Sequence, residues 1–137
     1  MADIQINITD NSEATLQEFE RATQAALEAC GQQAASHAKQ NLTAAGRVDT
    51  GALRNSVNSA VSGKAAYVGT NMSYAKFHEM GTGIYIAGGR KSPWAYQDNK
   101  GNWHRTRGVS PIHFIKNAVA DHVAEYKRII QQYLSRP

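Results

Sequence analysis

Histidine residues are the first candidates for chemistry in this sequence, because imidazole ligates metal ions and exchanges a proton near neutral pH. The pair His78-Glu79 begins like a zinc-protease motif, but Gly81 and Thr82 follow where a second histidine would have to stand. None of the histidines lies at a metal-ligand spacing from another histidine, a cysteine or a carboxylate. The sequence therefore predicts no metal centre. The five histidines are scattered: His37, His78, His104, His113 and His122.

Nucleophilic and phosphate-binding patterns are missing as well. Cys30 lies among alanines in a strongly helical stretch, where a small apolar side chain packs well. Gly81-Thr82-Gly83 begins like a dinucleotide-binding loop, but Ile86 stands where the third glycine belongs. No phosphate-binding Gly-Lys-Ser/Thr and no Gly-x-Ser-x-Gly elbow occurs. We therefore expect that the protein is not an enzyme and that it binds no cofactor.

Charge is concentrated in the segment 81–110. It holds five basic residues against Asp98, a net charge of +4, while the rest of the chain is balanced. Such a segment suits an acidic surface or nucleic acid, although a plain solvated loop would look similar. The candidate partner-binding residues are the basic and tryptophan side chains of this loop: Arg90, Lys91, Trp94, Lys100, Trp103, Arg105 and Arg107.

The first half of the chain must supply the elements that position these residues. Alternating isoleucines predict a strand at 3–9, and a helical stripe follows until Gly46 ends it. Gly31 is expected to mark a bend or a close contact of that helix. Two runs, 55–62 and 64–70, predict a hairpin around Ser62-Gly63. The stripe residues of the first helix are Leu16, Phe19, Thr23, Ala26, Leu27, Cys30, Ala34, His37, Ala38 and Leu42.

The second half predicts two helices separated by a long loop. Residues 74–80 can form two helical turns that stop at Gly81. The final helix should start with Ser110 as N-cap and Pro111 at its first position. Its apolar stripe comprises Ile115, Ala118, Val119, His122, Val123, Tyr126, Ile129, Ile130 and Tyr133.

The long loop itself contains a predicted hairpin at 94–105. Asp-Asn-Lys-Gly at 98–101 suits a turn in which Gly101 takes a positive φ. If Gln97 pairs with Asn102, Tyr96 faces Trp103, and Trp94 faces Arg105 on the same side, close enough for a cation–π contact.

Length and element order together predict the fold class. At 137 residues, we expect one domain over 1–137: an α+β fold in which two long helices cover one face of a small antiparallel or mixed sheet, with the loop 81–110 as an insertion. No run approaches the roughly 20 apolar residues of a membrane-spanning helix, and no signal peptide is evident. We therefore expect a cytoplasmic protein without a membrane partner.

Three clusters occur in a fixed order, at 48–56, 74–82 and 111–118. Together they resemble the family of tailed-bacteriophage tail-completion and head-to-tail joining proteins. Two departures are visible: the proline frequent before the Val-Asp-Thr-Gly run is replaced by Gly46-Arg47, and the loop between Thr82 and Pro111 is long. The motif or subunit-interface positions that the resemblance marks are Asp49, Thr50, Gly51, Leu53, Arg54, Tyr74, Glu79, Gly81, Thr82, Pro111 and Phe114.

These residues also have local interpretations. Asp49 or Thr50 can cap the turn that holds Leu53, and Tyr74 and Phe77 would pack inward. Gly51, Leu53, Phe77, Phe114 and Ala118 are expected mainly to build the fold. For Asp49, Arg54 and Glu79, local capping and contacts across subunits both stay open.

The resemblance implies a structural virion protein that works as one member of a ring. The ring would be a hexamer, or alternatively a dodecamer, at the phage neck, assembled in the host cytoplasm. Its partners would be a neighbouring connector or head-closure ring, the tail-tube protein, and genomic DNA touched without base reading. The alternative is a sequence-independent nucleic-acid-binding protein that uses the basic aromatic loop.

Overall fold

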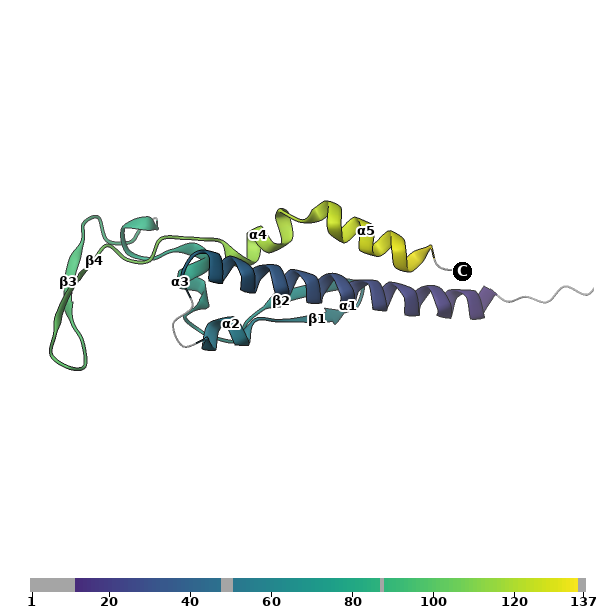
Figure 1. Cartoon of the computed structure of the whole chain (residues 1–137), viewed down its shortest axis with the longest axis horizontal. Helices are drawn as coiled ribbons and strands as arrows, with labels where there is room; N and C mark the ends of the chain where they lie inside the picture. The colour runs from purple at the N-terminus through teal and green to yellow at the C-terminus, as the bar shows by residue number, and fades with distance from the viewer. Residues whose placement is uncertain (1–11, 48–50, 87, 136–137) are drawn as a thin grey trace, which may run out of the picture.

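The computed structural model describes residues 12–47, 51–86 and 88–135. The predicted strand at 3–9 and the motif residues Asp49 and Thr50 lie outside these ranges. The described chain has an elongated shape, with one long helix along its axis and a hairpin at the end far from the C-terminus (Figure 1).

The long helix α1 (Ser12–Ala44) confirms the predicted stripe and its stop, because Gly46 follows with φ 70°. Its first stripe residues, Leu16 and Phe19, are each 55% exposed, so only the later part of the stripe is buried. Cys30 is buried as expected, and burial, followed by the charge of Glu125, raises the pKa of its thiol. Its role is therefore packing.

A short helix and a hairpin follow α1. The helix α2 (Ala52–Ser56) buries Leu53, so the predicted strand start at residue 55 is wrong: those residues complete a helical turn. The strands β1 (Asn58–Ser62) and β2 (Ala65–Gly69) pair antiparallel, with Ser62 opposite Ala65. The expected close contact at Gly31 is confirmed, because a Cβ there would lie 3.0 Å from the Cβ of Ser59.

The final helix differs from the prediction in two ways. It is divided into α4 (Phe114–Ala120) and α5 (Val123–Leu134), and it begins at Phe114 rather than after Ser110. The start is displaced because the N–H groups of Ile112 and His113 donate to the carbonyls of His78 and Glu79, which keeps this segment out of the helix.

The division between α4 and α5 falls at His122, whose φ of −128° and ψ of 25° are not helical. The Tyr126 hydroxyl donates to the carbonyl oxygen of Ala118, the acceptor that the N–H of His122 would use in an uninterrupted helix. This side-chain bond stabilises the bend. Burial of the Tyr126 side chain raises the pKa of its hydroxyl to about 12.

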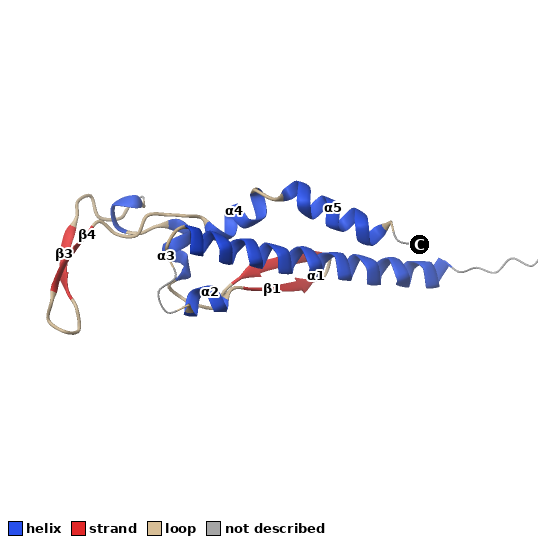
Figure 2. Cartoon of the chain, viewed as in Figure 1, coloured by secondary structure: helices blue, strands red, loops and turns tan. Residues whose placement is uncertain are grey.

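The core forms where the elements meet on α1. Helix α1 contacts β1 and β2 on one side and α4 and α5 on the other (Figure 2). The predicted α+β class is confirmed, and α1 is the helix that packs against both strands of the hairpin. The buried cluster comprises Ala35, Ala38, Leu42, Leu53, Val57, Ala75, Phe114 and Ala118.

The remaining elements lead into the loop. Helix α3 (Ala75–Met80) ends at Gly81 with φ 83°, as predicted, and a 3-10 turn η1 (Gly83–Tyr85) follows. The strands β3 (Trp94–Gln97) and β4 (Trp103–Thr106) form a second two-stranded sheet. Over the described ranges, every helix is too short or too polar to cross a membrane.

Candidate functional site

The segment 81–110 forms an arm, which we define as these residues, that leaves the body through a stem of two paired chains. The N–H of Thr82 donates to the carbonyl of Val109 at 2.8 Å, and the N–H of Ile84 to that of Arg107 at 3.0 Å. Gly83 makes this approach possible, because its φ is 65° and a Cβ would lie 2.3 Å from the Arg107 carbonyl oxygen. The arm is thus anchored by backbone hydrogen bonds.

The hairpin at the end of the arm is confirmed, with Gly101 at φ 85°, but its predicted register is wrong by one residue. Gln97 pairs with Trp103, and Tyr96 with His104. The register shifts because Asp98 pairs with Asn102: its N–H donates to the Asn102 carbonyl, and its carboxylate accepts from the N–H of Asn102 at 2.8 Å. A one-residue shift turns every side chain of β4 to the opposite face.

The two faces of the hairpin therefore differ. Tyr96 stacks on His104 with ring centres 5.3 Å apart, while Trp103 and Arg105 occupy the other face. The predicted contact between Trp94 and Arg105 is wrong; Arg90 instead places its guanidinium 4.6 Å from the Trp94 ring centre. Trp103 is 70% exposed and lies on the face opposite the stack of Tyr96 and His104.

The turn is stiffened by a carboxylate. His104 contacts Asp98 with Nε2 2.6 Å from Oδ2, and this bond, followed by the N–H of Asn102, lowers the pKa of Asp98. The ionised carboxylate also accepts from the N–H of Lys100 at 2.9 Å. The turn thus presents a fixed shape. The basic residues of the arm are all exposed: Arg90, Lys91, Lys100, Arg105 and Arg107.

The second and third clusters meet at a junction between α3 and α4. The Glu79 carboxylate accepts from the N–H of Ile115 and from the N–H of Lys116, each at 2.9 Å. Glu79 therefore caps α4, a helix 35 residues further along the chain. Gly81 is buried where its Cβ would lie 2.9 Å from Cδ of Pro111. The prediction that Tyr74 and Phe77 pack inward is wrong, since they are 38% and 41% exposed.

Arg47 ties the same junction to the end of α1. Its Nη1 lies 3.1 Å from Nδ1 of His78, and its Nη2 donates to the Ser110 hydroxyl at 2.7 Å. Ser110 is thus an acceptor for a guanidinium and not the predicted N-cap. Burial, and then the positive charge of Arg47, lowers the pKa of His78. His78 is held neutral, with Nδ1 as acceptor.

This lowered pKa predicts a pH dependence of stability. The unfolded chain binds a proton at His78 more readily than the folded chain does. The neutral ring therefore contributes to the free energy of unfolding above the ordinary pKa of 6.5, and this contribution is lost as the pH falls below that value. We expect urea unfolding to show a smaller loss of stability between about pH 7.5 and about pH 5.5 for His78→Gln than for wild type. Equal losses in both proteins would contradict the assignment.

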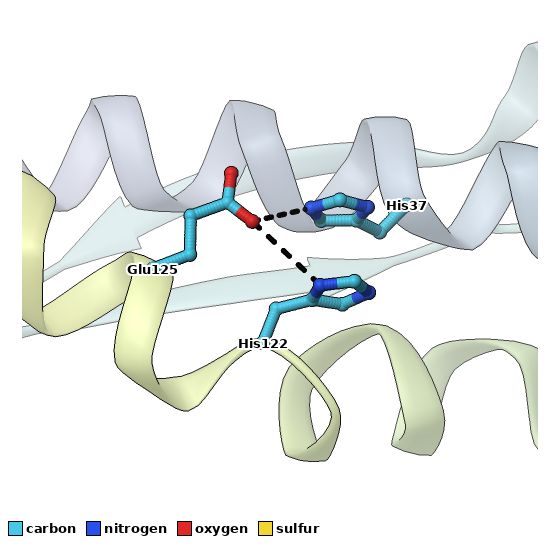
Figure 3. Close-up of side chains that lie close together, drawn as sticks. All are labelled: His37, His122 and Glu125. Carbon is cyan, nitrogen blue, oxygen red and sulfur yellow. Dashed lines mark hydrogen bonds and ion pairs between the residues drawn. The ribbon is translucent and has the colours of Figure 1, made fainter.

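Sequence reasoning missed one cluster in the body of the molecule. His37 of α1, His122 at the bend and Glu125 of α5 point toward one another (Figure 3). His37 and Glu125 are 88 residues apart, so no spacing along the chain could connect them. The sequence contained only a weak indication of this cluster. Both histidines fall on predicted apolar stripes, and His122 and Glu125 are three residues apart on one predicted helix.

Comparison with known proteins matches residues 7–81, more than half of the chain, to the family described as "Bacteriophage HK97-gp10, putative tail-component". The chain belongs to this HK97-gp10-like family. Searches of curated proteins and of solved structures gave no match.

Membership of the HK97-gp10-like family defines the general role of the protein. It is a structural component of a bacteriophage tail, located in the virion and in contact with other virion proteins. The matched range contains the first cluster in full and the second cluster as far as Gly81, whereas the third cluster and most of the arm lie beyond it. The resemblance to a phage tail family, expected from the clusters, is thereby confirmed.

Proposed function

We propose that this HK97-gp10-like chain is a tail-completion or head-to-tail joining subunit that forms a ring, most simply a hexamer, in the phage neck. The observation that carries the proposal is the family match over 7–81, which includes the cluster at 48–56 and all but the last residue of the cluster at 74–82. A ring of identical subunits needs heterologous contacts, in which one surface of each subunit meets a different surface of the next. The exposed Arg54 on α2 is a candidate for that contact.

The elongated shape supports this assignment. The hairpin β3–β4 stands at one end of the molecule, away from the helices that make the core (Figure 1). In a ring, an arm held by its stem can reach either the central channel or a neighbouring ring without disturbing the core. Its exposed basic residues suit the phosphates of passing DNA or an acidic surface.

Native mass spectrometry of the full chain tests the ring. We expect a closed oligomer of six copies, and we expect Arg54→Glu to shift it toward monomers. Lys64→Glu, a charge reversal at another exposed position, in the β1–β2 turn, is the matched control and should leave the oligomer intact. A wild-type chain that stays monomeric, alone and in the presence of its tail-tube partner, would refute the ring.

The arm yields a separate prediction about DNA. The double variant Lys100→Glu/Arg105→Glu should weaken binding to duplex DNA about tenfold at low salt and make the salt dependence shallower, because fewer counterions are released. Lys64→Glu/Lys127→Glu carries the same change of charge elsewhere on the surface and serves as control. Fluorescence anisotropy over a salt series measures both. Equal losses in the two variants would mean that net charge, and not the arm, attracts DNA.

The alternative function, a nucleic-acid-binding protein that acts without a ring, has one observation in its favour. Trp103 is exposed on the same hairpin face as Arg105, an arrangement in which a base can stack beside a phosphate contact. Tight binding of short single strands by a monomer, abolished by Trp103→Ala, would favour this function over the neck ring.

A further inference from the structure

Two helices that are distant in sequence bring three metal-ligating side chains together. His37 projects from α1, His122 from the bend before α5, and Glu125 from the first turn of α5 (Figure 3). The Glu125 Oε2 lies 2.9 Å from Nε2 of His37 and 3.6 Å from Nδ1 of His122. All three donor atoms lie within 4.8 Å of one another.

We propose that His37, His122 and Glu125 bind one divalent transition-metal ion, of which Zn²⁺ is the best match, and that the ion joins α1 to α5. Two imidazole nitrogens and one carboxylate oxygen form a donor set that Zn²⁺ favours, whereas Ca²⁺ and Mg²⁺ prefer oxygen ligands alone. Nothing in the proposed neck function requires this site.

The distances from the Glu125 carboxylate to the two imidazoles fit a small ion. In a tetrahedral zinc site with bonds of about 2.0–2.1 Å, neighbouring ligand atoms lie about 3.3 Å apart. The two separations from Glu125, 2.9 and 3.6 Å, bracket that value. The imidazole rings stack with centres 3.5 Å apart and planes 4° from parallel, so binding requires a ring rotation that aims both lone pairs at one point. Rotation about the last imidazole torsion meets only a broad, shallow potential.

Exposure leaves room for a further ligand. The side chain of His37 is 13% exposed, while those of Glu125 and His122 are 30% and 32% exposed. Solvent water can therefore complete the coordination, and an ion can enter without opening the core.

The bend between α4 and α5 positions the ligands. An uninterrupted helix would carry His122 in helical geometry, whereas its φ of −128° turns the residue out of both helices. Tyr126 stabilises this bend through its bond to Ala118, and its ring meets the edges of His37 and His122 at 6.5 Å between centres. The bend and the aromatic wall beside it thus hold both rings near Glu125.

Calorimetric titration tests the site. The full chain, prepared without a histidine tag and stripped with a chelator, should bind one Zn²⁺ per chain and melt at a higher temperature in its presence. Glu125→Gln and His37→Asn should each weaken binding by at least about tenfold. His104→Asn is the matched control, because His104 also contacts a carboxylate, that of Asp98, but no third metal-ligating side chain of the described residues completes that pair.

A second readout separates coordination from loose surface binding. Co²⁺ titrated in place of Zn²⁺ should give the intense visible absorption of a four-coordinate nitrogen and oxygen site, and Glu125→Gln should abolish it. Circular dichroism establishes that each variant is folded before titration. Absence of saturable binding in the folded wild type, or equal Zn²⁺ affinity in Glu125→Gln and wild type, would overturn the proposal.

Discussion

Phe114→Ala should lower the free energy of unfolding by about 4 kcal/mol, the cost of removing a fully buried aromatic ring and leaving its space unfilled. Phe114 is 0% exposed and begins α4, where that helix reaches the core on α1. Its backbone carbonyl accepts from the Asn41 side-chain amide at 3.0 Å, which fixes the start of α4 against α1. Neighbouring side chains cannot refill the space unless α1 and α4 move toward each other.

Phe77→Ala is the matched control, because it removes the same side chain from a site that is 41% exposed. Its expected cost is about 1 kcal/mol or less, since water already reaches much of the ring. Urea unfolding of the three proteins measures both effects. A loss below about 1.5 kcal/mol for Phe114→Ala would mean that the site collapses around the truncated side chain.

The sequence predicted best the features that depend on neighbouring residues. The stripe of α1, its stop at Gly46, the α3 stop at Gly81 and the turn at Gly101 all follow from local periodicity or from a positive φ that glycine accepts. Each is decided within one or two turns of chain. The same local signals located the arm and its basic residues.

Features that depend on distant partners were mispredicted or missed. The Ser-Pro pair at 110–111 is a strong local helix start, but the carbonyls of His78 and Glu79 pair with the N–H groups that follow it. The hairpin register followed from the Asp98 side chain, which a pattern of turn residues does not specify. The cluster at His37 needed the bend before α5, and that bend depends on a side-chain bond to a helix carbonyl.

Glu79→Ala should cost about 2 kcal/mol, because it removes a charged acceptor to which two N–H groups without a helical partner of their own donate. The loss should fall on the link between α3 and α4, since the backbone carbonyl of Glu79 also accepts from His113 in the same segment. Glu20→Ala, in an exposed position of α1, is the matched control with an expected effect within about 0.5 kcal/mol.

Glu79→Gln then separates charge from hydrogen bonding, because the amide oxygen can still accept one N–H while the charge that favours a helix N-terminus is gone. We expect it to fall between wild type and Glu79→Ala in unfolding free energy. The two roles that the sequence left open for Glu79 give different results in native mass spectrometry. If Glu79 acts only as a cap, the folded Glu79→Gln chain assembles as wild type does. Lost assembly with unchanged stability would instead place its carboxylate between subunits.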